Sequence, residues 1–475
     1  MDQATALNHM QDAWLEDLFQ QQKYAFQQHP NPSLSERKQY LRQLKTQLLK
    51  HQNQISEAIQ QDFGNRSHDE TRLAELLPSV MGINYAIKHV KEWMQPNKRH
   101  VGLLFQPAQA YVMYQPLGVV GIVVPWNYPL FLAIGPLCQA LAAGNRVMLK
   151  MSEFTPIFSA LLQKLIAEIF PQDLVHVITG DANVAQQFTA LPFDHLLFTG
   201  ATSIGQHVMQ AAAKNLTPVT LELGGKSPAI IGQQADLRES VLRIAFGKSM
   251  NSGQTCVAPD YAFVPETELE RFIEYYQQAI HQFYPKIEQN ADYTHIINNR
   301  QYQRLNAYLE DATEKGATVI PLYKNDTTAS RCLSHYLVYN VNSSMQLMQD
   351  EIFGPILPIM TYKNIEDVID YIRKRPRPLA LYYFGSNIQE QQQILTQTHS
   401  GGVCLNETLV HVGQDDLPFG GIGASGMGSY HGYEGFLTFS HAKSVFVRPQ
   451  LSFMKFIYPP YGTKVQKMIY KWFLR

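Results

Sequence analysis

Cysteine is scarce in this chain, which has four among 475 residues, and no two of them are spaced as CxxC. This scarcity excludes a disulfide framework and a cysteine-based zinc site, and it is typical of a reducing compartment. The 16 histidines show no H-E-x-x-H spacing, so no metal is expected. We expect a cytoplasmic protein, because the acidic N-terminus lacks a signal-peptide pattern and no run of about 18 apolar residues occurs.

A strong net charge of either sign is also missing. The 39 Lys and Arg nearly balance the 40 Asp and Glu, which gives a formal net charge of -1. A chain with this balance has no general field that attracts nucleic acid, so nucleic acid is not expected as a partner. Its length exceeds that of a single hydrophobic core and predicts two or three folding units.

The sequence changes texture along its length. The first hundred residues predict helices, because Ser33–Glu36 reads S-x-x-E, a capping box, before leucines at helical spacing. From Val119 onward, short β-branched runs alternate with helix-like segments, and a second series of the same kind follows Gly225. This alternation predicts parallel sheets covered by helices. The expected fold class is therefore α/β with two lobes and a ligand cleft between them.

Two strand ends in the first series suit a dinucleotide. The stretch FTGATSIG is a strand followed by a turn at Gly200 and a helix start with Ser203 and Gly205, where backbone amides receive a pyrophosphate. Its G-x-x-x-x-G spacing is not the usual fingerprint, so an ordinary strand-to-helix turn is an equal interpretation. Lys150 and Glu153 end another strand and suit either the hydroxyls of a ribose or a surface ion pair.

Two further residues place reactive side chains in unusual settings. Glu222 closes the apolar strand of LELGGKSP before a Gly-Gly turn, a position that favours a ligand over solvent. Cys256 lies in GQTCVAPD. A lone cysteine is usually a small packing residue, and that role is expected for Cys138, Cys332 and Cys404. The other motifs of the chain decide whether Cys256 is a packing residue or a reactive one.

Seven motifs occur in one order along the chain: PWNYP, KMSE, FTGATSIG, LELGGKSP, GQTCVAPDY, EIFGP and LPFGGIGASGMGSYHG. This series resembles the signatures of the aldehyde dehydrogenase superfamily over roughly residues 35–450. The segments APDY, SGMGSYHG and FSHAKSV resemble its class 3 branch, especially bacterial members of the coniferyl-aldehyde type. The resemblance implies a Rossmann-type cofactor domain, an α/β catalytic domain and small oligomerisation strands.

The resemblance also implies roles for three residues. Cys256 would be the nucleophile that attacks an aldehyde carbonyl and then carries a thioester. Asn127 and the backbone N–H of Cys256 would stabilise the oxyanion, and Glu222 would activate the water that releases a carboxylic acid. Two other classes stay open from the residues alone: a cofactor-independent thiol esterase and a non-catalytic scaffold protein.

A nicotinamide cofactor is implied by the same resemblance. Glu153 would meet the charge of a 2′-phosphate, so NAD is expected to be preferred, with NADP as a second cofactor. Met151 stands where many relatives carry proline, and we expect it to loosen that turn slightly. The residues expected to contact the cofactor are Trp126, Lys150, Glu153, Gly200, Ser203, Gly205, Glu351 and Phe353.

Substrate choice is implied less directly. Tyr128, Leu130 and Phe419 are wall positions by resemblance, together with residues 406–411, and most of these side chains are aromatic or apolar. Hydrophobic aldehydes are therefore expected. Aromatic cinnamyl-type compounds and medium or long alkanals both fit, because an apolar slot separates such molecules by only about 1 to 3 kcal/mol per methylene.

The C-terminus carries a separate pattern. Apolar residues recur at helical spacing between Val465 and Phe473, with lysines and Arg475 on other positions, which predicts a basic amphipathic helix. Packing on its own or a neighbouring subunit is one expectation, and weak contact with an anionic membrane is the other. The resemblance implies a homodimer. The expected domains are an NAD-binding domain (1–97 and 117–224), a catalytic domain (225–429), an oligomerisation element (98–116 and 430–450) and a tail (451–475).

Overall fold

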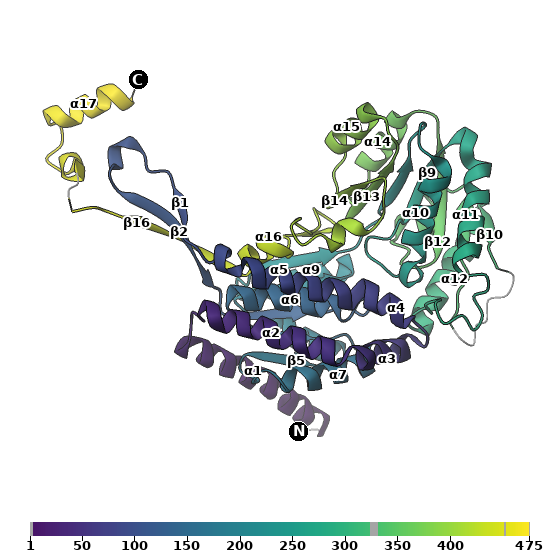
Figure 1. Ribbon diagram of the computed structural model, residues 1–475, viewed down its shortest axis with the longest axis horizontal. Coiled ribbons are helices and arrows are strands. Elements are labelled where there is room, and N and C mark those ends of the chain that lie inside the picture. Colours follow the sequence, from purple (N-terminus) through teal and green to yellow (C-terminus); the bar gives the residue numbers. More distant parts are fainter. Residues whose placement is uncertain (1–2, 324–330, 451–452, 475) are drawn as a thin grey trace.

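Three β-sheets organise the chain in the computed structural model, which describes residues 3–323, 331–450 and 453–474 (Figure 1). The first sheet has the strand order β15-β7-β6-β3-β4-β5, and every pair in it is parallel except β15 with β7. Its strands are β3 (Val119–Val123), β4 (Arg146–Lys150), β5 (Val175–Ile178), β6 (His195–Gly200), β7 (Val219–Leu223) and β15 (Gly426–Met427). The strands expected between residues 119 and 223 are confirmed.

Both faces of this sheet are buried, which explains why its strands read as continuous apolar runs. Val120 and Ile122 point into one core and Val119 into another, as alternation along a strand requires. The capping box at Ser33 and Glu36 begins α2, as predicted. The helices of this part are α1 (Gln3–Gln28), α2 (Leu34–Lys50), α3 (Gln52–Phe63), α4 (His68–Thr71), η1 (Arg72–Leu76), α5 (Leu77–Trp93), α6 (Phe131–Ala143), α7 (Pro156–Ala167), α8 (Ala182–Ala190) and α9 (Thr202–Ala213).

A second sheet has the order β10-β11-β12-β9-β8-β13-β14 and is parallel except for the β10–β11 pair. It belongs to the second α/β series that the sequence predicts. Its strands are β8 (Pro228–Ile231), β9 (Tyr261–Pro265), β10 (Thr318–Pro321), β11 (Tyr336–Tyr339), β12 (Ile356–Tyr362), β13 (Ala380–Phe384) and β14 (Gly402–Leu405). Its helices are α10 (Leu237–Ser249), η3 (Met250–Gly253), η4 (Glu266–Glu268), α11 (Leu269–Phe283), α12 (Asn299–Glu314), α13 (Gln346–Gln349), α14 (Ile365–Arg373), α15 (Ile388–Gln397) and η6 (Val410–Gly413).

A third, antiparallel sheet of order β1-β2-β16 extends away from the two lobes (Figure 1). We call residues 97–116 and 440–475 the arm. Its described elements are β1 (Asn97–Arg99), η2 (Leu103–Phe105), β2 (Gln109–Pro116), β16 (Ser440–Val447), η7 (Phe453–Ile457) and α17 (Lys464–Phe473), with α17 near the far end (Figure 1). Arg475 lies outside the described residues.

Two short segments pack against a different domain from the one that the expected domain ranges assign to them. Strand β15 falls in the range expected for the catalytic domain, yet it pairs with β7 of the first sheet. Helix α16 (Gly432–Thr438) falls in the range expected for the oligomerisation element, yet it packs against α5 and α6. Buried Phe436 explains the second case, because its ring lies 5.6 Å from the ring of Trp93 at the end of α5. In the described ranges, no helix combines the length and apolarity that crossing a bilayer requires.

Candidate active site

A cavity of about 650 Å³ is lined by residues that follow strands of both large sheets. Open α/β sheets bind ligands beyond the carboxyl ends of their strands, which is where these residues lie. This cavity is lined by nine of the residues that were predicted from the sequence for catalysis, cofactor binding or substrate binding: Trp126, Asn127, Gly200, Ser203, Glu222, Cys256, Glu351, Phe353 and Phe419. The fold therefore brings an amide, a carboxylate and a thiol from distant segments into one chamber.

Glu222 is the buried carboxylate of this chamber. It lies on β7 and is only 3% exposed, and neither carboxylate oxygen has a hydrogen-bond partner among the residues that the structure describes. Burial raises its pKa well above the ordinary value of a glutamate. A buried carboxyl left without a partner at a cavity is costly for folding and indicates a functional group.

Cys256 follows η3 and is half-buried at the cavity wall. Burial, followed by the charges of Glu351 and Glu222, raises the pKa of its thiol to about 12. The thiol is therefore mainly protonated at neutral pH and needs a proton acceptor before it can act as a nucleophile. Cys138, Cys332 and Cys404 are buried away from this wall and pack as expected.

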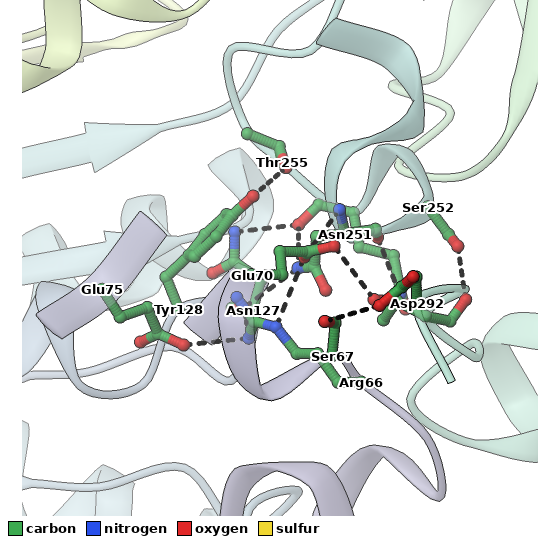
Figure 2. A network of polar contacts seen from close by, with 12 residues as sticks. Arg66, Ser67, Glu70, Glu75, Asn127, Tyr128, Asn251, Ser252, Thr255 and Asp292 are labelled. Carbon is green, nitrogen blue, oxygen red and sulfur yellow. Dashed lines mark hydrogen bonds and ion pairs between the residues drawn. The ribbon is translucent and has the colours of Figure 1, made fainter. Parts of the chain in front are cut away.

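Asn127 lies in the loop between β3 and α6, and Figure 2 shows it among the polar side chains of Arg66 and Asn251. Its side-chain Nδ2 donates to the backbone oxygen of Gln254 at 3.1 Å, which ties it to the loop that carries Cys256. A carboxamide has two N–H donors, and this bond uses one of them. The second suits an oxyanion that develops on a carbonyl beside Cys256.

The other end of the cavity offers a place for a dinucleotide. Helix α9 begins there, and its N-cap residue Ala201 provides no side-chain cap, so the amides of the first turn suit a phosphate. Across the cavity, the Glu351 carboxylate lies so close to Gly224 that a Cβ at this glycine would sit 1.9 Å from Oε2. The Phe353 ring lies 5.4 Å from the Trp126 ring. The residues present therefore fit a nicotinamide dinucleotide.

Three of the expected cofactor residues do not line the cavity. Lys150 is buried, with Nζ donating to the backbone oxygens of Met151 and Gly180 at 2.7 and 2.8 Å, and Glu153 is exposed nearby. Gly205 instead allows α9 to approach β7, because a Cβ there would lie 2.6 Å from Leu223. Met151 donates its N–H to the oxygen of Ile178 at 2.9 Å, a bond that proline lacks, and the expected loosening of this turn stays a prediction.

Two of the expected substrate positions are also corrected. Leu130 is fully buried in the core just before α6, and Leu132 lines the cavity instead. Tyr128 is buried beside the cavity, where its hydroxyl bonds Thr255 at 2.8 Å. The sequence spacing did not predict which side chains near the start of α6 face the cavity and which face the core.

The sequence analysis assigned no role to several groups at or beside the cavity, although Tyr430 and Lys226 lie within two of its motifs. Tyr430 lines it, and its buried hydroxyl has no partner among the described residues. Lys226 forms an ion pair with Asp260. Arg66 and Glu70 form a pair four residues apart beside Asn127 (Figure 2). The R-x-x-x-E spacing was the available signal, but such pairs are common on helix surfaces.

A family model described as "Aldehyde dehydrogenase family" matches residues 3–445. The chain belongs to the aldehyde dehydrogenase family. It is accordingly an oxidoreductase, and the resemblance seen in the sequence is confirmed. Within the described ranges of this aldehyde dehydrogenase, no group of three or more His, Cys, Asp or Glu is arranged to hold a metal ion.

Relatives of this aldehyde dehydrogenase match nearly its whole length. A protein of Pseudomonas aeruginosa named probable coniferyl aldehyde dehydrogenase is 58% identical over 461 residues, covering 97% of this chain and 96% of its own. The substrate-bound structure of Staphylococcus aureus AldH has a TM-score of 0.92 and 36% identity, covering 97% and 99%. A Mycobacterium tuberculosis aldehyde dehydrogenase complexed with NAD+ has a TM-score of 0.82 and 26% identity, covering 92% and 90%.

Proposed function

We propose that this aldehyde dehydrogenase oxidises hydrophobic aldehydes to carboxylic acids in the cytoplasm, with NAD as the preferred oxidant and NADP as a second. The observation that supports this most is the convergence of Asn127, Glu222 and Cys256 on one cavity, with Glu222 buried and without a partner among the described residues. An esterase would need no dinucleotide, yet the same cavity continues to the start of α9.

In the first half of the reaction, Sγ of Cys256 forms a bond to the aldehyde carbon, and its proton passes to the carboxylate of Glu222, which returns it to solvent before the second half. The carbonyl electrons move to oxygen, where the free N–H of the Asn127 amide and the backbone N–H of Cys256 receive the charge. Donors of this kind are each worth about 3 kcal/mol of barrier. When bound, the nicotinamide cofactor accepts the two electrons and the hydrogen of the oxidation, which leaves a thioester on Cys256.

In the second half, Glu222 removes a proton from water, and the resulting oxygen nucleophile attacks the thioester carbon. The C–S bond breaks, the acid leaves, and Cys256 recovers its thiol. The raised pKa of Glu222 makes its carboxylate a strong proton acceptor, which suits a general base. Glu351 and Phe353 would position the nicotinamide, and Ser203 and Trp126 would lie near the phosphates. Lys150 and Glu153 lie outside the cavity lining, so their contact with the adenosine ribose stays a prediction.

The substrate end favours aromatic aldehydes of the cinnamyl type. Leu132, Phe419 and Tyr430 line the cavity there, and the aromatic rings offer flat contacts to a planar conjugated substrate. The name of the Pseudomonas aeruginosa relative supports this choice. Medium and long alkanals are the competing class, because the same side chains are apolar.

A panel of cinnamyl, benzyl and C6 to C16 aldehydes, each ranked by kcat/KM with NAD and with NADP, tests the proposal. We expect the highest values for cinnamyl aldehydes with NAD. Equal or higher values for long alkanals would overturn the substrate class. Product formation that persists without a dinucleotide would indicate the thiol esterase instead.

A homodimer is part of the proposal. The arm contains nine Lys and Arg and no Asp or Glu, so the other residues hold 30 of the 39 basic residues against all 40 acidic ones. The arm exposes Leu103, Phe105 and Phe446, which are 73%, 40% and 54% accessible. An apolar and basic arm suits the acidic lobes of a second copy. Light scattering after gel filtration should give twice the 54.1 kDa chain mass, whereas a monomer would contradict the dimer.

Weak membrane contact through α17 is a separate proposal. Helix α17 packs against η7 of its own chain and keeps most of its surface exposed, so packing on a neighbouring subunit and contact with a membrane both stay predictions. Trp472 is 71% exposed beside Lys464, Lys467 and Lys471, a pattern that suits an anionic bilayer surface. Deleting residues 464–475 should reduce co-sedimentation with anionic liposomes, and unchanged sedimentation would exclude membrane contact.

A further inference from the structure

Arg66 belongs to a buried polar network that includes Asn127 of the cavity wall (Figure 2). Its side chain is fully buried between the rings of Phe63 and Tyr128, at 5.1 and 4.9 Å from their centroids. The guanidinium pairs with Glu75 at 2.9 Å and with Glu70 at 3.4 Å. Buried ion pairs contribute little net stability, because desolvation offsets their attraction. Stability alone therefore does not account for this network.

Each carboxylate of the network holds a different segment. Glu75 accepts hydrogen bonds from the backbone N–H groups of Leu130 and Phe131, at 2.7 and 3.1 Å, where α6 begins. Glu70 accepts from the backbone N–H of Asn251 at 2.9 Å, in the turn that leads to Cys256. Arg66 thus joins the segment that carries the oxyanion donor to the segment that carries the nucleophile.

The network also holds Asn127 directly. Its backbone oxygen accepts from Nη1 of Arg66 at 3.1 Å and from Nδ2 of Asn251 at 3.0 Å. The same Asn251 amide donates to the backbone oxygen of Gln254, which is also the acceptor for the Asn127 side chain. Asn251 adopts a φ of 52°, a left-handed conformation that these contacts hold in place. The backbone and the side chain of Asn127 are therefore fixed relative to the loop of Cys256.

We propose that Arg66 is a positioning residue that aims the free N–H of the Asn127 amide at the oxyanion formed on Cys256. This inference rests on the proposed function, in which Asn127 stabilises that oxyanion. Arginine suits the task because its planar fork reaches two carboxylates and a carbonyl oxygen at once, which lysine does not. The effect acts through Asn127 and not through contact with the substrate.

A double-mutant cycle tests the inference. We expect Arg66→Lys to lower kcat/KM by about 10- to 100-fold, the loss typical of a misplaced group. The affinity for NADH, measured by fluorescence titration, should stay unchanged. In an Asn127→Ala background the same substitution should cost less than about twofold, because the group that it positions is gone. Equal losses in both backgrounds would overturn the inference.

Arg37→Lys is the matched control. Arg37 is also almost fully buried, yet its guanidinium bonds the backbone oxygens of Pro32 and Ala142, which are not among the residues that line the cavity. Its replacement should affect kcat/KM by less than about twofold. A loss as large as that of Arg66→Lys would mean that the removal of any buried arginine damages the enzyme, and it would overturn the assigned role.

Asn251→Gly provides a second cycle if Arg66→Lys does not fold. Glycine tolerates the left-handed backbone but removes the amide that holds Asn127. We expect the same dependence on Asn127, and full activity of Asn251→Gly would contradict the network's role. An undiminished rate for Asn127→Ala alone would contradict the proposed function itself, whereas additive losses contradict only the positioning role.

Discussion

In the catalytic cavity, polar groups from three distant segments meet within one chain, whereas the arm carries its apolar side chains outward. Asn127 and Glu222 are each 3% exposed at the cavity wall, while Leu103 and Trp472 on the arm are more than 70% exposed. Charge divides in the same way, since the nine Lys and Arg of the arm face no Asp or Glu within it, whereas the remaining chain has an acidic excess. The cavity therefore gathers its polar groups from one chain, whereas the exposed apolar side chains of the arm are typical of an interaction surface.

Among the variants of the cavity and the arm, Cys256→Ala is expected to reduce activity most. Loss of the nucleophile should reduce NADH formation by at least about 10⁴-fold, as for other covalent catalysts. Binding of NADH, followed by fluorescence, should persist because the cofactor end of the cavity is untouched. Steady NADH production near the parent rate would remove Cys256 from the mechanism.

Glu222→Gln should come next in size. The water that releases the acid would lose its base, so the steady-state rate should fall by about 10² to 10⁴-fold. Formation of the thioester, seen as a burst of NADH, should be affected far less. In the parent enzyme the rate should rise with pH until the raised pKa of Glu222 is passed, because the base works when deprotonated. A pH profile unchanged by Glu222→Gln would contradict the role.

The stability of the parent depends on the same carboxyl, but it changes with pH in the opposite sense to the rate. Because burial raises the folded-state pKa of Glu222 above its unfolded value, the parent is relatively stable at low pH and loses stability as pH rises. Glu222→Gln should therefore be more stable than the parent by about 1 to 3 kcal/mol near pH 9, since the carboxylate is left without a bond. Urea unfolding at pH 5 and pH 9 measures this, and equal differences at both would contradict it.

The smallest effect on catalysis is expected from the arm. Replacing Lys464, Lys467 and Lys471 by Glu reverses the charge of α17 far from the cavity lining. The value of kcat should change by less than about twofold, while sedimentation with anionic liposomes should be lost. A large fall in kcat would contradict this prediction, because it would mean that catalysis in the cavity depends on the arm.

The sequence predicted the parts of the site that lie in contiguous motifs. Glu222 and Cys256 stand at a strand end and a glycine-rich turn, and both line the cavity. The same kind of inference was wrong at Leu130, because the turn before α6 buries this side chain and exposes Leu132 to the cavity. Gly205 lies in a motif as well, but the contact that explains it is with Leu223 on another element.

What the sequence alone determined is the set of local features: the capped helix α2, the buried parallel strands and the ordered motifs, each of which depends on neighbours along the chain. The three-dimensional packing brings Arg66 and Asn251 to the backbone oxygen of Asn127, across separations of 61 and 124 residues. It also leaves Glu222 buried and without a partner in the described chain. Burial and long-range hydrogen bonds depend on how distant segments pack, and no local pattern of residues encodes that geometry.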